Sequence, residues 1–255
     1  MTIQLLYSLS WPQRKQPVEV FMQTEQPNYA LRPYCEEDYQ AIAKLIAQTW
    51  EFDTFCTPQV AKLLSYVYLD ECLVEQNFAQ VAICNNQIAG IIMGNSFCDH
   101  CALKQDQLRL AHNQEALNST FEGREVSSFF EQIYKVDDTL LTNTGHQYQG
   151  KVELFIVNST FQGLGLGKKL FASCLDFFKL KKVNDFYIFT DSSCNFGFYD
   201  HMGMKCQGHE KLFYQENGEQ QCLDMFIYDN SPNHHQGCPE HNILSNSHGS
   251  FLKAV

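Results

Sequence analysis

The stretch Val157-Asn-Ser-Thr-Phe-Gln162-Gly-Leu-Gly-Leu-Gly167-Lys-Lys169 decides the fold of this chain of 255 residues. It joins a predicted strand, 151–157, to a predicted amphipathic helix, 166–182, and glycines alternate between the two. Glycine permits positive φ and close backbone approach, so successive N–H groups can point into one hollow where the helix begins. The start of a helix attracts anions such as pyrophosphate. Lys168 and Lys169 add positive charge at its rim.

Two common phosphate loops do not fit this stretch. A P-loop, GxxxxGK[ST], fails because Gln162 stands at its first glycine and Lys169 at its Ser or Thr. The GxGxxG loop of dinucleotide-binding folds fails because the three glycines here are spaced GxGxG and no β-α-β start precedes them. A plain glycine-rich turn stays an alternative.

The pattern Gln162-x-x-Gly165-x-Gly167 resembles the pyrophosphate loop of the GNAT superfamily of N-acetyltransferases. Further along, Asn195-Phe-Gly-Phe-Tyr199-Asp-His-Met-Gly203 is similar to the second signature of that superfamily, a Phe-Tyr pair followed by a glycine. The resemblance extends more weakly over about residues 29–229. It departs from the family at Ser192, where Asn is common, and in a longer insertion at about 97–148.

Hydrophobic periodicity predicts an order of elements that mixes hairpins with helical crossovers. That order indicates an α/β (mixed α+β) domain, with a mixed, mostly antiparallel sheet flanked by helices. The GNAT resemblance implies that this sheet is splayed beside 151–157, at the acyl-CoA site. The predicted strands are 29–32, a hairpin within 79–96, 151–157, 186–190, 204–214 and 221–228. The predicted helices begin near residues 36 and 58, occur twice within 97–148, and span 166–182 and 196–201.

Composition divides the chain into three parts. Residues 1–28 are predicted to be an arm, 29–229 a GNAT-like acyltransferase domain with a helical insertion at about 97–148, and 230–255 a disordered tail rich in Asn, Ser, His, Gly and Pro. The longest apolar runs are too short to span a bilayer, and Met1–Ser10 lacks the positive segment of a signal peptide. We therefore expect a cytoplasmic protein with no membrane partner.

The formal net charge of −11 argues against a nucleic-acid partner. Acidic residues in the first half and in the insertion favour a cationic small molecule, polyamine or peptide amine as acceptor, and a homodimer is possible. Cys98 and Cys101 have the spacing of half a zinc site. No second CxxC exists, so ordinary thiols and no metal are expected.

The resemblance implies acetyl-CoA as cosubstrate and assigns roles to particular residues. Tyr199 is the candidate general acid for the departing thiolate, with a purely packing tyrosine as the alternative. Glu153 on the 151–157 strand is the candidate base for the amine, with Asp191 in reserve and His201 and His146 as weaker options. The cofactor-binding residues implied are Ile156, Val157, Gln162, Gly163, Leu164, Gly165, Leu166, Gly167, Lys168, Lys169 and Asn195.

The predicted function is N-acetyl transfer from acetyl-CoA to a primary amine, by direct attack in a ternary complex. Three alternatives stay open: a non-catalytic CoA-binding sensor, an acyltransferase with another acyl chain or an oxygen acceptor, and a nucleotide-binding protein that uses the same glycine loop.

Overall fold

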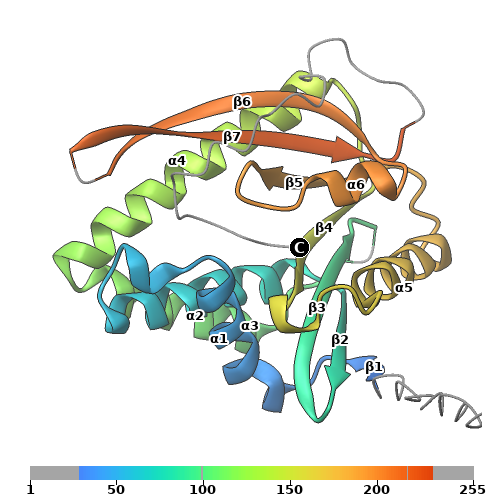
Figure 1. Ribbon diagram of the computed structural model, residues 1–255, viewed down its shortest axis with the longest axis horizontal. Helices are drawn as coiled ribbons and strands as arrows, with labels where there is room; N and C mark the ends of the chain where they lie inside the picture. Colours follow the sequence, from blue (N-terminus) through green and yellow to red (C-terminus); the bar gives the residue numbers. More distant parts are fainter. Residues whose placement is uncertain (1–28, 99, 217, 232–255) are drawn as a thin grey trace, which may run out of the picture.

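The computed structural model describes residues 29–98, 100–216 and 218–231. They form one seven-stranded sheet in the order β1-β2-β3-β4-β5-β7-β6, with helices on both faces (Figure 1). The predicted arm, 1–28, lies outside the described residues, and so does the predicted tail except for Asn230 and Ser231. Asn230 is tied to the domain, because its Oδ1 accepts from the Phe186 N–H at 3.0 Å and its Nδ2 donates to the Asn184 carbonyl at 2.6 Å.

The predicted elements and the fold class are confirmed, with ends shifted by a few residues. The first half holds β1 (Tyr29–Pro33), η1 (Glu36–Asp38), α1 (Tyr39–Thr49), η2 (Phe52–Thr54), α2 (Pro58–Glu75), β2 (Phe78–Cys84) and β3 (Gln87–Ser96). The two helices predicted within the insertion are α3 (Lys104–Asn118) and α4 (Phe121–Thr144). The second half holds β4 (Gly150–Val157), η3 (Ser159–Phe161), α5 (Leu166–Leu180), β5 (Phe186–Asp191), α6 (Gly197–His201), β6 (Lys205–Glu216) and β7 (Glu219–Asp229).

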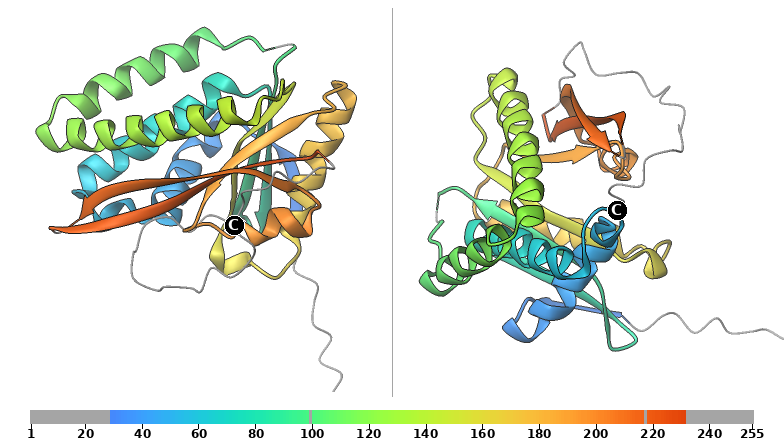
Figure 2. Two further views of the ribbon diagram at one scale, coloured as in Figure 1. Left: turned by 90° about the horizontal axis from the view of Figure 1, so that it is seen from above. Right: turned by 90° about the vertical axis from the view of Figure 1, so that its left-hand side faces the viewer.

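The sheet separates two hydrophobic cores. On one face, apolar side chains of α1, α2, α3 and α4 pack with strand residues such as Leu154 and Ile156. On the other face, α5 and α6 pack with strand residues such as Phe155 and Val157. Figure 2 shows α5 on the opposite side of the sheet from α1–α4. This arrangement follows from the alternation of side chains along a strand, which sends neighbouring residues to opposite faces.

Helix α4 has signals at both ends that the sequence carries openly. Its N-cap is Thr120, whose Oγ1 accepts from the Gly123 N–H at 2.9 Å. Its C-cap is Gly145 in the left-handed region, with φ of 64°. These caps fix where the helix begins and ends, and so they set which of its residues can reach the sheet.

Strands β4 and β5 are parallel, but they pair only at their first residues. Gly150 pairs with Phe186 and Lys151 with Tyr187, and no further pair joins the two strands. Beyond Lys151 the strands separate, as the predicted splay requires. On its other edge, β4 pairs with β3 along its whole length. The register shifts once, because Met93 faces Leu154 and Gly94 faces Val152, which skips one residue of β4.

That irregularity places Glu153 as the extra residue of a β-bulge. Val152 and Phe155 both belong to the core under α5, whereas Leu154 belongs to the core under α1–α4. Strict alternation, as the sequence suggests, would put Glu153 on the same face as Phe155 and Val157. The bulge breaks that alternation, because one extra residue shifts the following side chains to the other face.

Candidate functional site

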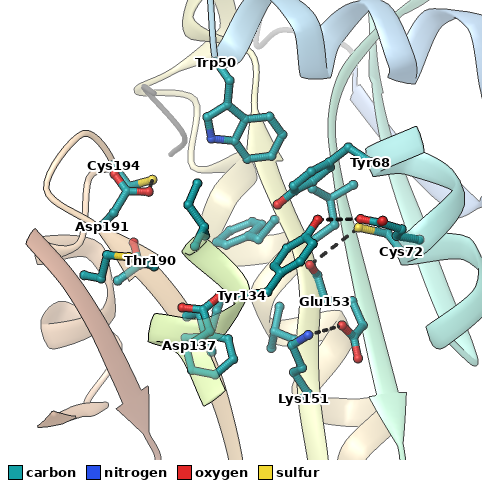
Figure 3. Close-up of a pocket in the computed structure, with 18 of the residues that line it drawn as sticks. Trp50, Tyr68, Cys72, Tyr134, Asp137, Lys151, Glu153, Thr190, Asp191 and Cys194 are labelled. Atoms are coloured by element: carbon teal, nitrogen blue, oxygen red, sulfur yellow. Dashed lines mark hydrogen bonds and ion pairs between the residues drawn. The ribbon is translucent and has the colours of Figure 1, made fainter. Parts of the chain in front are cut away.

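A cavity of about 310 Å³ occupies the gap where β4 and β5 part. Its walls come from both cores: Phe155, Ile188 and Tyr199 from the α5 side, and residues of α2 and α4 from the other side. Figure 3 shows Tyr68 and Cys72 on α2, Tyr134 and Asp137 on α4, and Lys151 and Glu153 on β4 around it. The cavity therefore connects the two faces of the sheet through the splay.

The glycine loop lies next to one side of this cavity. Gly163 and Gly165 have φ of 80° and 74°, a region that other residues seldom adopt, and Gly165 is the N-cap of α5. Gly167 packs near Phe155, which lines the cavity. Within the described residues, no oxygen accepts from the backbone N–H groups of residues 163–168. The loop thus presents donors of the kind that a pyrophosphate requires.

Most of the cofactor-binding residues predicted in the loop are exposed to solvent. Gln162, Leu164, Lys168 and Lys169 are exposed, whereas Leu166 is buried in the core. The Nζ of Lys169 lies 4.1 Å from the ring centre of Tyr29, which holds this cation beside the loop. The basic rim predicted from the sequence is therefore present at the start of α5.

The other predicted cofactor residues lie in two places, on β4 and in the turn before α6. Ile156 and Val157 pair with Ile91 and Gly90 of β3 on one edge. Their other edge faces the splay, where β5 has already parted from β4. Asn195 is exposed in the turn before α6 and does not line the cavity.

Tyr199, the predicted acid, lines the cavity from α6 and is 5% exposed. Burial raises the pKa of its phenol well above the ordinary value, so the hydroxyl keeps its proton at neutral pH. Its ring lies 5.7 Å from those of Phe198 and Tyr228. A buried, protonated hydroxyl in a cavity can donate a proton to a leaving group.

Glu153, the predicted base, also lines the cavity, but its carboxylate is engaged. Lys151 Nζ lies 2.6 Å from Glu153 Oε2, and Asn95 Nδ2 donates to Glu153 Oε1 at 3.3 Å. Burial alone would lower the pKa of Lys151, yet the carboxylate beside it holds that pKa above its ordinary value. Both oxygens of the Glu153 carboxylate are therefore already occupied.

The remaining base candidates divide between cavity and surface. Asp191 lines the cavity, where burial raises its pKa against the hydrogen bonds from Ser193 and Cys194. His201 is exposed, and its Nδ1 lies 2.6 Å from the Gly197 carbonyl oxygen. Neither His201 nor His146 lines the cavity.

The sequence analysis missed the wall that α2 and α4 contribute. Asp137 is the clearest omission: it lines the cavity, and burial raises its pKa to about 7. Glu71 lines it too and accepts from the Tyr134 hydroxyl at 2.5 Å, while burial raises its pKa. The signal for Asp137 was its helical spacing from Phe130, Ile133 and Tyr134, which puts all four on one face of a helix.

Among the described residues, no three His, Cys, Asp or Glu side chains are grouped closely enough to hold a metal ion. Cys98 and Cys101 are both exposed thiols. None of the described helices combines the length and apolarity needed to cross a bilayer.

No family model matches this sequence, and no curated protein matches it either. Solved structures do match. Arylalkylamine N-acetyltransferase 2 from Aedes aegypti has a TM-score of 0.51 at 17% identity, over 81% of this chain and 100% of that one. A GNAT family acetyltransferase from Elizabethkingia anophelis with acetyl-CoA bound has a TM-score of 0.43 at 16% identity, over 79% and 97%. Ribosomal-protein-alanine N-acetyltransferase from Brucella melitensis has a TM-score of 0.47 at 14% identity, over 78% and 98%. This chain shares the fold of the Aedes aegypti enzyme, and at such identities the likeness shows the fold alone.

Proposed function

We propose that this chain transfers an acetyl group from acetyl-CoA to a primary amine, with both substrates bound together in the gap between β4 and β5. The observation that carries this proposal is the cavity, which joins the side of the glycine loop to the side of α2 and α4. A reaction between two substrates needs such a shared space, because holding the reacting groups together supplies much of the rate enhancement.

The chain's own residues fit the donor. The N–H groups of residues 163–168 have no acceptor within the described part of the chain, so they are free to bind a pyrophosphate, with Lys168 and Lys169 adding charge. The edge of β4 at Ile156 and Val157 faces the splay and can bind an extended amide-bearing arm by backbone hydrogen bonds. When bound, the thioester supplies the acyl group.

Two side chains are proposed to move protons. Tyr199 donates its phenol proton to the departing sulfur; because burial raises its pKa, the hydroxyl keeps that proton until the thiolate forms. Glu153 is the base candidate from the sequence, and its carboxylate already accepts from Lys151 and Asn95. Any amine near Glu153 therefore competes with those two partners.

The first test is thermal unfolding with CoA, acetyl-CoA, ATP or NAD. A ligand present at about 100 times its Kd adds about 2.7 kcal/mol of stability, which raises the midpoint measurably. We expect a shift with CoA and acetyl-CoA only. A shift with ATP or NAD instead would favour a nucleotide-binding protein, and no shift with any of them would contradict the proposed function.

The second test separates catalysis from binding. Release of CoA thiol is measured with acetyl-CoA and a panel of primary amines. We expect Tyr199→Phe to lower kcat by roughly 10²–10⁴-fold while CoA binding is kept. Tyr66→Phe is the matched control, because Tyr66 bonds Gln40 at the surface and does not line the cavity. Thiol release that Tyr199→Phe leaves unchanged would make this tyrosine a packing residue only.

A further inference from the structure

The carboxylates around the cavity differ in what they already bind. Besides the exposed Glu75, four carboxylates line the cavity. Three of these four already accept a hydrogen bond or form an ion pair. Glu71 accepts from the Tyr134 hydroxyl at 2.5 Å, Glu153 from Lys151 Nζ at 2.6 Å, and Asp191 from the Ser193 N–H at 2.8 Å. Asp137 is the exception, since its Oδ1 is buried and has no hydrogen-bond partner among the described residues.

A second polar atom in the same cavity is also unpartnered. Thr190 Oγ1 is buried and has no partner among the described residues, and Thr190 lines the cavity from β5. Buried polar atoms without a partner are rare in folded proteins. Two of them, from an α4 residue and a β5 residue that line one cavity, indicate a ligand that carries hydrogen-bond donors.

Much of the wall on the α2 and α4 side is aromatic. Trp50, Tyr68, Phe130 and Tyr134 all line the cavity. The ring centres are 4.6 Å apart for Trp50 and Tyr68, 6.3 Å for Tyr68 and Phe130, and 6.4 Å for Phe130 and Tyr134. Such a continuous array of rings binds an apolar group and also attracts a cation.

We propose that this part of the cavity binds a monoamine with a compact aromatic or aliphatic body, whose ammonium group is bound by Asp137 Oδ1 and whose body lies against the aromatic wall. The acyl donor of this reaction rests on the proposed function, whereas the amine site does not. A polyamine is disfavoured, because the other buried carboxylates of the cavity are occupied and its second ammonium would have only the exposed Glu75, where water weakens the attraction between charges. The inference thus narrows the cationic acceptors expected from the sequence.

Asp137 also serves as the proton acceptor, in place of Glu153, because both oxygens of the Glu153 carboxylate already have partners. One proton passes from the bound ammonium to the Asp137 carboxylate, which leaves a neutral amine and a carboxylic acid. The amine nitrogen then forms the bond to the acyl carbon as the carbon–sulfur bond breaks, and the sulfur takes its proton from Tyr199. The nitrogen loses its second proton to the Tyr199 phenolate, which restores the hydroxyl and leaves a neutral amide, a thiol and protonated Asp137. Charged groups face Asp137 from several elements: Lys151 lowers its pKa, and Asp191 and Asp138 raise it, next to the larger effect of burial.

The experiment compares Asp137→Asn with Asp138→Asn. Asp138 is the next residue of α4, is exposed and does not line the cavity, so it is a matched control. Binding of 2-phenylethylamine, hexylamine and spermidine is measured by calorimetry, with and without CoA. We expect 2-phenylethylamine and hexylamine to bind wild type at least tenfold more tightly than spermidine, and Asp137→Asn to weaken both by at least tenfold.

Kinetics give a second readout that a merely structural role would not change. In wild type, kcat/KM for the amine should rise with pH through a limb near the pKa of Asp137. Asp137→Asn should lower kcat/KM by roughly 10²–10⁴-fold and remove that limb, so that the rate follows only the free amine in solution. Asp138→Asn should keep the rate and the limb, with the limb moved slightly to lower pH because Asp138 raises the pKa of Asp137.

Failures of the two proposals are distinguishable. Wild type that binds the amines but not CoA would contradict the acyl transfer and leave the amine site standing. Equal binding of 2-phenylethylamine to wild type and Asp137→Asn, or a tenfold preference for spermidine, would overturn the amine site whatever the result with CoA.

Discussion

Asp70 and Glu71 are consecutive residues of α2, yet they belong to two acidic regions that are built in opposite ways. Asp70 joins the arginine cluster, in which Arg109 Nε, Nη1 and Nη2 lie 2.5, 2.7 and 2.8 Å from carboxylate oxygens of Asp70, Glu36 and Asp106. Glu71 joins the cavity carboxylates, which we define as Glu71, Asp137, Glu153 and Asp191. In the first region one guanidinium forms ion pairs with three acids. In the second, a buried oxygen of Asp137 has no hydrogen-bond partner among the described residues.

The acids of the arginine cluster hold the fold together, whereas we propose that Asp137 binds a ligand. The arginine cluster joins α3 to α2 and to η1, and Asn113 Nδ2 adds a bond to Asp70 at 2.7 Å. Arg109 also stacks over the ring of Tyr39, at 4.5 Å from its centre. Each of the three acids is paired with Arg109, and Asp70 requires this most, because buried charges are stable only when they are paired and hydrogen-bonded. Of the cavity carboxylates, Asp137 alone has a buried oxygen without a partner among the described residues, and we propose that a cationic substrate supplies that partner.

The largest expected effect comes from breaking the arginine cluster. Arg109→Met leaves the carboxylate of Asp70, which is fully buried, without its cation. We expect the free energy of unfolding to fall by about 3–5 kcal/mol, as for other buried ion pairs that lose one partner. Urea unfolding measures this loss. Arg124→Met is the control, since Arg124 is exposed and bonds only the Asn118 carbonyl, and a loss as large there would show that the cluster is not special.

A smaller loss should follow from Lys151→Met. The Glu153 side chain is 5% exposed and would keep only its bond to Asn95. We expect a loss of about 2–3 kcal/mol, since a buried acceptor loses its strongest partner. The pKa of Asp137 should also move upward, because Lys151 now lowers it. The unfolding free energy and the pH limb of kcat/KM measure the two effects, and a limb that did not move would argue that Lys151 and Asp137 are not coupled.

The smallest effect has the opposite sign. The pKa of Asp137 is raised to about 7 in the folded protein, above its unfolded value, so between about pH 4 and 7 the folded state binds more protons and stability falls as pH rises. Asp137→Asn removes that loss. We expect it to raise the free energy of unfolding by about 1–2 kcal/mol at pH 8 and to change it little near pH 4.

The same unfolding experiment on Asp138→Asn supplies the reference. Asp138 is exposed, and a substitution there should stay within about 0.5 kcal/mol at both pH values. If Asp137→Asn were destabilising at pH 8, Asp137 would belong with the arginine cluster as a residue that holds the fold together. The comparison between the two acidic regions would then fail.

The sequence predicted the fold because the relevant signals are local. Helical and alternating periodicity located the strands and helices, and the glycine spacing located the loop before α5, where Gly163 and Gly165 adopt positive φ. The sequence also singled out Tyr199 and Glu153, and both line the cavity. Their roles as acid and base stay predictions, as do the cofactor contacts of the loop and of Asn195.

By itself, then, the sequence determined the order of elements and the glycine loop before α5, for which anion binding stays a prediction. Only the tertiary structure decided how the acids are used. The bulge that turns Glu153 away from Phe155 depends on the pairing of β4 with β3, and the position of Asp137 depends on how α4 packs across the parted strands. Consecutive helix residues point about 100° apart, so Asp70 and Glu71 face different neighbours. Periodicity tells which side of a helix is buried, whereas the partner of each buried charge is set by contacts between segments far apart in the chain.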